Sequence, residues 1–171
     1  MMPQIKKILY ATDLSKNSGF VLRHAISMAK KYGAKITVLH VLEQSSATIS
    51  ALAEVHLTLE QIREVTENRF EYARETLQDR IQTVCRKELG NDPAAMEIFD
   101  TINVVDGFPA DQILRRADEF KCDAIVMGTH GKGSLMHSYF GSTAKRVIRR
   151  SNLPVVVVPL PKRESEYEYD D

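Results

Sequence analysis

Five short apolar runs, separated by segments with helical periodicity, constrain the fold of this 171-residue chain more than any other feature. Each run is long enough for one strand, and its continuous apolar character suits burial on both faces of a sheet. Strands that alternate with helices predict a parallel α/β sheet whose connections are right-handed crossovers. The runs are KKILYAT (6–12), KITVLHV (35–41), TINVVDG (101–107), CDAIVMG (122–128) and PVVVVP (154–159).

The segments between these runs carry helix signals. Apolar residues recur three or four positions apart after the first run, and Gly33 is placed to end that helix. A long helix is predicted from about 58 to 89, because no Gly or Pro interrupts the helical spacing before Gly90. Pro109 is placed at the first turn of another helix, and a last helix is predicted at about 142–150. Helices on both faces of the sheet follow from this alternation.

Charge and composition narrow the function classes. Lys plus Arg and Asp plus Glu both total 23, so the chain lacks the basic surplus of a protein that grips nucleic acid phosphates. No apolar run approaches the roughly 18–20 residues of a membrane span, and the N-terminus lacks the pattern of a signal peptide. Cys85 and Cys122 show no metal-binding spacing, and the histidines form no HxxxH or HExxH pair. We expect a cytoplasmic protein with reduced thiols, no nucleic acid or membrane partner, and no residue assigned as a metal ligand.

Domain organisation is predicted to be simple. Residues 1–160 are expected to form one domain, since this length can bury a complete core. Residues 161–171 form an acidic tail, and its last ten positions, KRESEYEYDD, carry five acids against two bases. We expect this tail to be solvated and disordered. The segment 43–57 is left open between loop and short helix.

The stretch GTHGKGSLMHSYFGST, residues 128–143, connects the fourth run to the last predicted helix. Glycine lets a ligand approach the backbone, and a helix N-terminus offers free N–H groups that favour a phosphate. His130 and Lys132 could add positive charge, although backbone contact is favoured for His130. The alternative is a glycine turn with an ordinary helix cap and no ligand. The stretch is neither a Walker A loop nor a GxGxxG fingerprint.

Its glycine spacing, G-x2-G-x9-G-[ST], resembles that of the nucleotide-binding universal stress proteins. KKILYATD, the HV that ends the second run, DGFPADQI, IVMGTHGKG and NLPVVVVP resemble the family's landmarks in order, from about Lys6 to Pro159. Ala11 departs from the pattern, since many members have proline there. The resemblance implies a five-stranded parallel sheet of order 3-2-1-4-5 with ATP, AMP or ADP in its crevice, accompanied by Mg²⁺ or Mn²⁺. It also implies a homodimer through the last strand, formed by Val155, Val156, Val157 and Val158.

The resemblance also assigns a nucleotide site. Asp13 would contact the ribose or its neighbourhood, the backbone of Val41 would face the adenine edge, and Gly128 would lie near the ribose and α-phosphate. Residues 141–143 would cradle the phosphates together with Gly131. An alternative role for Asp13 is a cap for the turn after the first strand. The assigned residues are Ala11, Thr12, Asp13, Val41, Met127, Gly128, Thr129, His130, Gly131, Lys132, Gly133, Gly141, Ser142 and Thr143.

Motifs that would indicate an efficient enzyme are absent from the sequence. There is no G-x-S-x-G elbow, no SGGxDS loop after the first run and no HIGH-type motif. The sequence therefore predicts a dimeric, ATP-binding stress-response regulator or switch, with at most slow ATP hydrolysis. The alternative is a nucleotide-free interaction protein of the same fold, in which the loop glycines are only structural.

Overall fold

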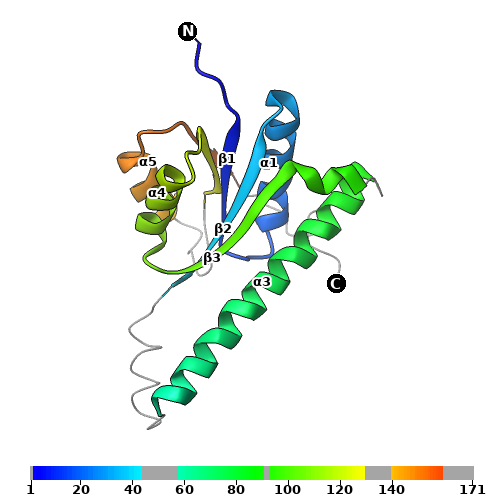
Figure 1. Ribbon diagram of the computed structural model, residues 1–171. Coiled ribbons are helices and arrows are strands. Elements are labelled where there is room, and N and C mark those ends of the chain that lie inside the picture. The colour runs from blue at the N-terminus through cyan, green and yellow to red at the C-terminus, as the bar shows by residue number, and fades with distance from the viewer. Residues whose placement is uncertain (1, 44–57, 91–92, 130–139, 160–171) are drawn as a thin grey trace.

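The computed structural model describes residues 2–43, 58–90, 93–129 and 140–159 (Figure 1). Five parallel strands form one sheet in the order β3-β2-β1-β4-β5, which confirms the predicted fold class and strand order. Two strands extend beyond the predicted runs, β2 at its end and β3 at its start, because these residues continue the β2–β3 pairing. The strands are β1 (Lys7–Thr12), β2 (Lys35–Glu43), β3 (Phe99–Gly107), β4 (Ala124–Gly128) and β5 (Val155–Val158).

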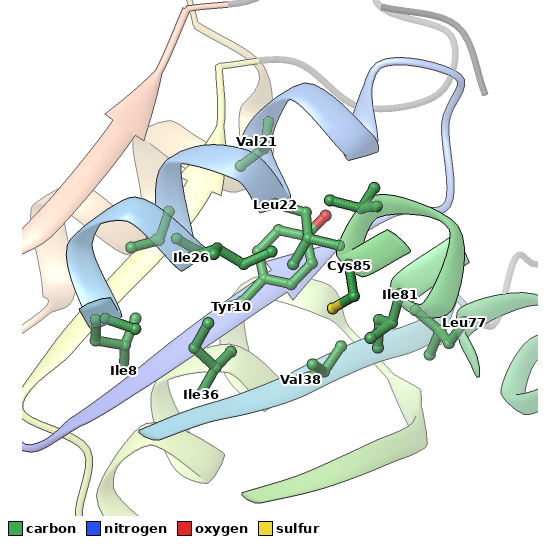
Figure 2. Close-up of a cluster of buried hydrophobic side chains, with 14 of the residues drawn as sticks. Ile8, Tyr10, Val21, Leu22, Ile26, Ile36, Val38, Leu77, Ile81 and Cys85 are labelled. Carbon is green, nitrogen blue, oxygen red and sulfur yellow. The ribbon is translucent and has the colours of Figure 1, made fainter. Parts of the chain in front are cut away.

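Helices cover both faces of the sheet, with α1 and α3 on one face and α4 and α5 on the other (Figure 1). Side chains of β1 alternate between two apolar cores, so Ile8 and Tyr10 pack under α1 and α3, and Leu9 packs under α4 and α5. Figure 2 shows the first of these cores around Tyr10. The helices are α1 (Ser18–Tyr32), α3 (Leu59–Leu89), η1 (Pro93–Ile98), α4 (Pro109–Glu119) and α5 (Ser142–Arg150).

The long helix α3 begins where the sequence predicts. Thr58 is its N-cap and forms a capping box with Gln61, in which each side chain accepts a hydrogen bond from the other residue's backbone N–H. Its buried residues all lie between Ala73 and Cys85, whereas Leu59 is 87% exposed. The first half projects past the edge of the sheet in Figure 1. The buried side chains of α3 therefore lie on the part of the helix from Ala73 to Cys85.

Candidate functional site

A cleft of about 480 Å³ opens at the carboxyl ends of the parallel strands. Its walls come from the ends of β1, β2 and β4, the turn after β1, the first residues of α1, α4 and α5, and one residue of α3. Clefts at this edge are where parallel α/β sheets bind ligands, and the volume suits a small molecule.

Every predicted site residue within the described part of the chain lines this cleft. His130, Gly131, Lys132 and Gly133 lie outside the described residues. The residues that the fold brings together are Ala11, Thr12, Asp13, Val41, Met127, Gly128, Thr129, Gly141, Ser142 and Thr143.

The strand register explains how residues so distant in sequence meet. Ala11 of β1 pairs with Met127 of β4, and Thr12 pairs with His40 of β2. Parallel pairing places the ends of these strands at one edge, so Asp13 follows directly into the cleft. Asp106, at the end of β3, does not line the cleft; it pairs with Leu42.

Asp13 caps the turn after β1 and also lines the cleft. Its Oδ1 atom accepts a hydrogen bond from the backbone N–H of Ser15 at 3.1 Å, which caps the turn after β1. Its Oδ2 atom is buried and has no hydrogen-bond partner among the described residues. A buried carboxylate oxygen without a donor is unfavourable, so the cleft presents an acceptor that a ligand hydroxyl could satisfy.

The N-terminus of α5 forms the opposite part of the cleft wall. Gly141 is the N-cap, with extended backbone angles, and its N–H donates to the carbonyl oxygen of Thr129 at 2.7 Å. Gly141 has no side chain with which to cap the helix, and the first turn of the helix contains no acidic residue. Residues 142–144 all line the cleft, so the positive end of the helix dipole and its N–H groups are available to an anion.

His40 lines the cleft from β2 and was not predicted as a site residue. It is buried, and its Nδ1 atom donates to the carbonyl oxygen of Thr12 at 2.8 Å. The sequence signal that could have identified His40 as a site residue was its position directly before Val41, near the end of a predicted strand. Arg69 of α3 also lines the cleft. Nothing local in the sequence marks Arg69, because its place depends on how α3 packs against the sheet.

The two cysteines considered in the sequence do not line the cleft. Cys85 and Cys122 are both buried free thiols, and desolvation raises the pKa of each. Among the residues that the structure describes, no group of three or more His, Cys, Asp or Glu side chains could hold a metal ion. None of the described helices is long and apolar enough to cross a membrane.

Comparison with known proteins identifies relatives along nearly the whole chain. The model of the universal stress protein family matches residues 4–159. Universal stress protein MJ0531 of Methanocaldococcus jannaschii is 31% identical over 159 residues, which cover 93% of this chain and 85% of that protein. Universal stress protein MJ0577 of the same organism is 28% identical over 165 residues, which cover 92% of this chain and 97% of that protein.

Solved structures agree with this result. The structure of MJ0577 matches this chain with a TM-score of 0.71, over 94% of this chain and 99% of that one. A universal stress protein from Archaeoglobus fulgidus, solved in complex with dAMP, is 25% identical and matches with a TM-score of 0.53. That match covers 91% of this chain and 98% of the other.

Proposed function

This chain belongs to the universal stress protein family, and from that premise we propose that its cleft binds an adenine nucleotide, with ATP as the first candidate. A family member from A. fulgidus was solved in complex with dAMP, which supports this ligand class. AMP and ADP carry the same base and sugar and are included in the proposal. The biological role that we propose is a cytoplasmic stress-response regulator or switch.

The observation that carries the proposal is the unpartnered Oδ2 atom of Asp13 in the cleft. Leaving a buried acceptor unsatisfied costs about 1–3 kcal/mol, so a ligand that supplies a donor gains binding energy there. A ribose hydroxyl is such a donor, whereas a phosphate at this position would repel the carboxylate. The sugar is therefore proposed to lie at Asp13.

The two sides of Asp13 suit the two ends of a nucleotide. Towards β4 lies the N-terminus of α5, where the N-cap residue Gly141 has no side chain, and a helix N-terminus favours phosphate. Towards β3 lies the end of β2, where the backbone of Val41 is proposed to face the adenine edge. We propose that Ala11, Thr12 and the residues 127–133 complete the pocket.

Mg²⁺ or Mn²⁺ is proposed to accompany ATP. Because the described residues contain no metal cluster, we assign the ion to the phosphate oxygens of the nucleotide. The chemistry that it supplies there is charge neutralisation. No residue of this chain is assigned as its ligand, and hydrolysis is proposed to be slow at most.

A homodimer through β5 (Val155–Val158) is part of the proposal. β5 is the last strand in the sheet order and pairs with β4 alone among the described strands. Val155, Val156 and Val157 are only half-buried, so an apolar strand edge remains for a partner strand. Analytical ultracentrifugation of a Val156→Lys variant tests this: the variant should be monomeric. A wild-type protein that sediments as a monomer would contradict strand pairing.

Nucleotide analysis of freshly purified protein tests the ligand. Denaturation should release ATP, ADP or AMP, and added ATP with Mg²⁺ should raise the melting temperature. At a ligand concentration one hundred times the dissociation constant, the stabilisation is about 2.7 kcal/mol, which a thermal melt detects readily. GTP with Mg²⁺ is the control and should give a smaller shift. A flat melt together with no released nucleotide would favour a nucleotide-free interaction protein.

A further inference from the structure

Arg80 of α3 holds the turn between β1 and α1 from a distance of more than sixty residues in sequence. Its Nη1 atom donates to the carbonyl oxygens of Leu14 at 2.8 Å and Ser15 at 3.1 Å. The same nitrogen lies 3.2 Å from the Oγ atom of Ser18. Hydrogen bonds from a charged donor are stronger than those between neutral groups, so this arginine fixes the turn firmly.

The turn needs such support because its backbone is unfavourable. Leu14 has a φ angle of +59°, in the left-handed region that residues with a Cβ rarely adopt. Its side chain is nonetheless buried in the core under α1 and α3. The carbonyl groups that this conformation turns towards α3 accept from Arg80. Arg80 thus supplies a donor to both backbone acceptors. The carbonyl of Leu14 accepts from it at 2.8 Å, and the carbonyl of Ser15 accepts both from Arg80 and from the backbone N–H of Ser18 at 3.1 Å.

One residue links Arg80 to the proposed ligand site. The carbonyl of Ser15 accepts from Arg80, while the N–H of Ser15 donates to Oδ1 of Asp13 at 3.1 Å. This second bond fixes one carboxylate oxygen and leaves Oδ2 without a partner among the described residues. The orientation of Ser15 therefore sets the orientation of the Asp13 carboxylate.

We propose that Arg80 is a positioning residue for Asp13, and that through Asp13 it controls recognition of the ribose hydroxyls. Arg80 does not line the cleft, so it acts without touching the ligand. The claim that Arg80 controls recognition of the ribose hydroxyls rests on the proposed nucleotide function. The claim that Arg80 positions the Asp13 carboxylate does not rest on that function, because it depends only on contacts within the protein.

Substitutions of arginines along α3 separate this role from general support of the fold. Arg80→Met keeps the aliphatic stem and removes the guanidinium. Arg80→Lys restores a donor at one point, and a single ammonium can serve the turn because these three contacts to Leu14, Ser15 and Ser18 come from one nitrogen. Arg74→Met is the matched control, since Arg74 is an exposed arginine of the same helix.

Two measurements are made on each variant. The first is the ratio of affinities for ATP and 2′,3′-dideoxy-ATP. It should be on the order of tenfold in the wild type, as expected for hydrogen bonds to a charged group. It should fall towards one in Arg80→Met and persist in Arg80→Lys and Arg74→Met. The second is hydrogen exchange of the Ser15 amide without nucleotide, which should accelerate in Arg80→Met only.

The outcomes that overturn the proposal are distinct from failure of the proposed function. Unchanged exchange at the Ser15 amide in Arg80→Met overturns it, because the arginine then does not hold the turn at Asp13. Equal loss of affinity for both nucleotides, with the ratio retained, also overturns it. If the wild type binds neither nucleotide, the proposed function fails, and Ser15 exchange still decides whether Arg80 positions the carboxylate.

Discussion

The Nδ1 atom of His40 lies 2.8 Å from the carbonyl oxygen of Thr12, and the two residues are also register partners on β2 and β1. A carbonyl oxygen can only accept, so Nδ1 carries the hydrogen and donates it. The His40 side chain is buried, and both residues of this half-buried bond line the cleft. The bond fixes the last residue of β1, directly before Asp13.

Replacing His40 with leucine should destabilise the protein by about 0.5–1.5 kcal/mol, because the half-buried hydrogen bond to the carbonyl of Thr12 is lost. Urea denaturation measures the change. His24→Gln is the control: His24 is exposed on α1 and makes an edge-on ring contact with Phe20. A His40→Leu protein as stable as the wild type would show that the bond contributes nothing to the sheet edge.

Asp13→Asn separates ligand binding from folding. Asparagine keeps an Oδ1 acceptor for the Ser15 N–H and replaces the unpartnered Oδ2 with an amide group. We expect nucleotide-free stability to be retained or slightly increased, while affinity for ATP falls by about tenfold or more as a charge-assisted hydrogen bond is lost. Thermal melts and calorimetric titration measure the two effects.

Asp106→Asn serves as the control for Asp13. Asp106 is an exposed acid at the same edge of the sheet, and it lies outside the cleft. Its substitution should leave ATP affinity unchanged. Equal losses in both variants would indicate a general charge effect rather than a contact with the sugar.

Much of the fold could be predicted because the sequence pattern depends on local chemistry. In β1, apolar residues such as Ile8 and Leu9 are adjacent because both faces of a parallel strand are covered. Helical spacing without Gly or Pro predicted α3 from about Thr58, and the helix begins one residue later, at Leu59. The order of the strands came from the family resemblance and not from these local patterns.

The remaining features of the fold and the site depend on tertiary packing, which local sequence patterns do not predict. Apolar residues at helical spacing continue from Leu59 to Ala73, yet only Ala73 is buried. A 31-residue helix is about 46 Å long, whereas the nine-residue strand β2 spans only about 30 Å, so part of α3 must extend beyond the sheet. Arg69 and Arg80 reach the cleft and its supporting turn through this packing. Their roles could be found only in the folded structure.

Gly107→Ala should destabilise the start of α4. Gly107 has a φ angle of +130°, and a Cβ there would lie 2.8 Å from Nε2 of Gln112. The backbone strain alone is about 1–3 kcal/mol. Gly33→Ala is the comparison, since Gly33 has a φ angle of +64° with nothing within 4 Å of the added Cβ. Urea denaturation should show the larger loss at Gly107, and equal losses would contradict a steric contribution from Gln112.

Cys122 should make stability depend on pH in the alkaline range. Burial raises the pKa of its thiol from 9.0 to about 11. Between these values the unfolded chain loses the thiol proton while the folded protein keeps it, so the free energy of unfolding falls as pH rises. Below pH 9 the thiol is protonated in both states, and the full contribution of Cys122 to the free energy of unfolding is present.

A Cys122→Ala variant tests this dependence against the wild type. The variant loses buried contacts at every pH, so the informative quantity is the difference in unfolding free energy between the two proteins. That difference should narrow as pH rises from below 9 towards 11, when it is measured by urea denaturation. A constant difference across this range would show that the thiol titrates alike in the folded and unfolded chains.

Gly141→Asp tests whether the N-terminus of α5 is the phosphate site. The backbone of Gly141, with φ −65° and ψ 162°, is one that any residue adopts, so strain does not confuse the result. An aspartate there would cap the free N–H groups and place a negative charge at the helix dipole. Without nucleotide the variant should be more stable by about 0.3–1 kcal/mol, while its affinity for ATP should fall at least about tenfold.

Gly141→Asn and adenosine complete this test. Asparagine caps the helix with a side chain of the same size but without charge, so it should reduce ATP affinity less than aspartate does. Adenosine lacks phosphates, and its binding should be similar in both variants. If both variants lose the same amount of ATP affinity, the loss is caused by the size of the added side chain, which blocks the close approach of ATP to the backbone, and not by its charge. ATP binding as tight in Gly141→Asp as in the wild type would place the phosphates away from α5.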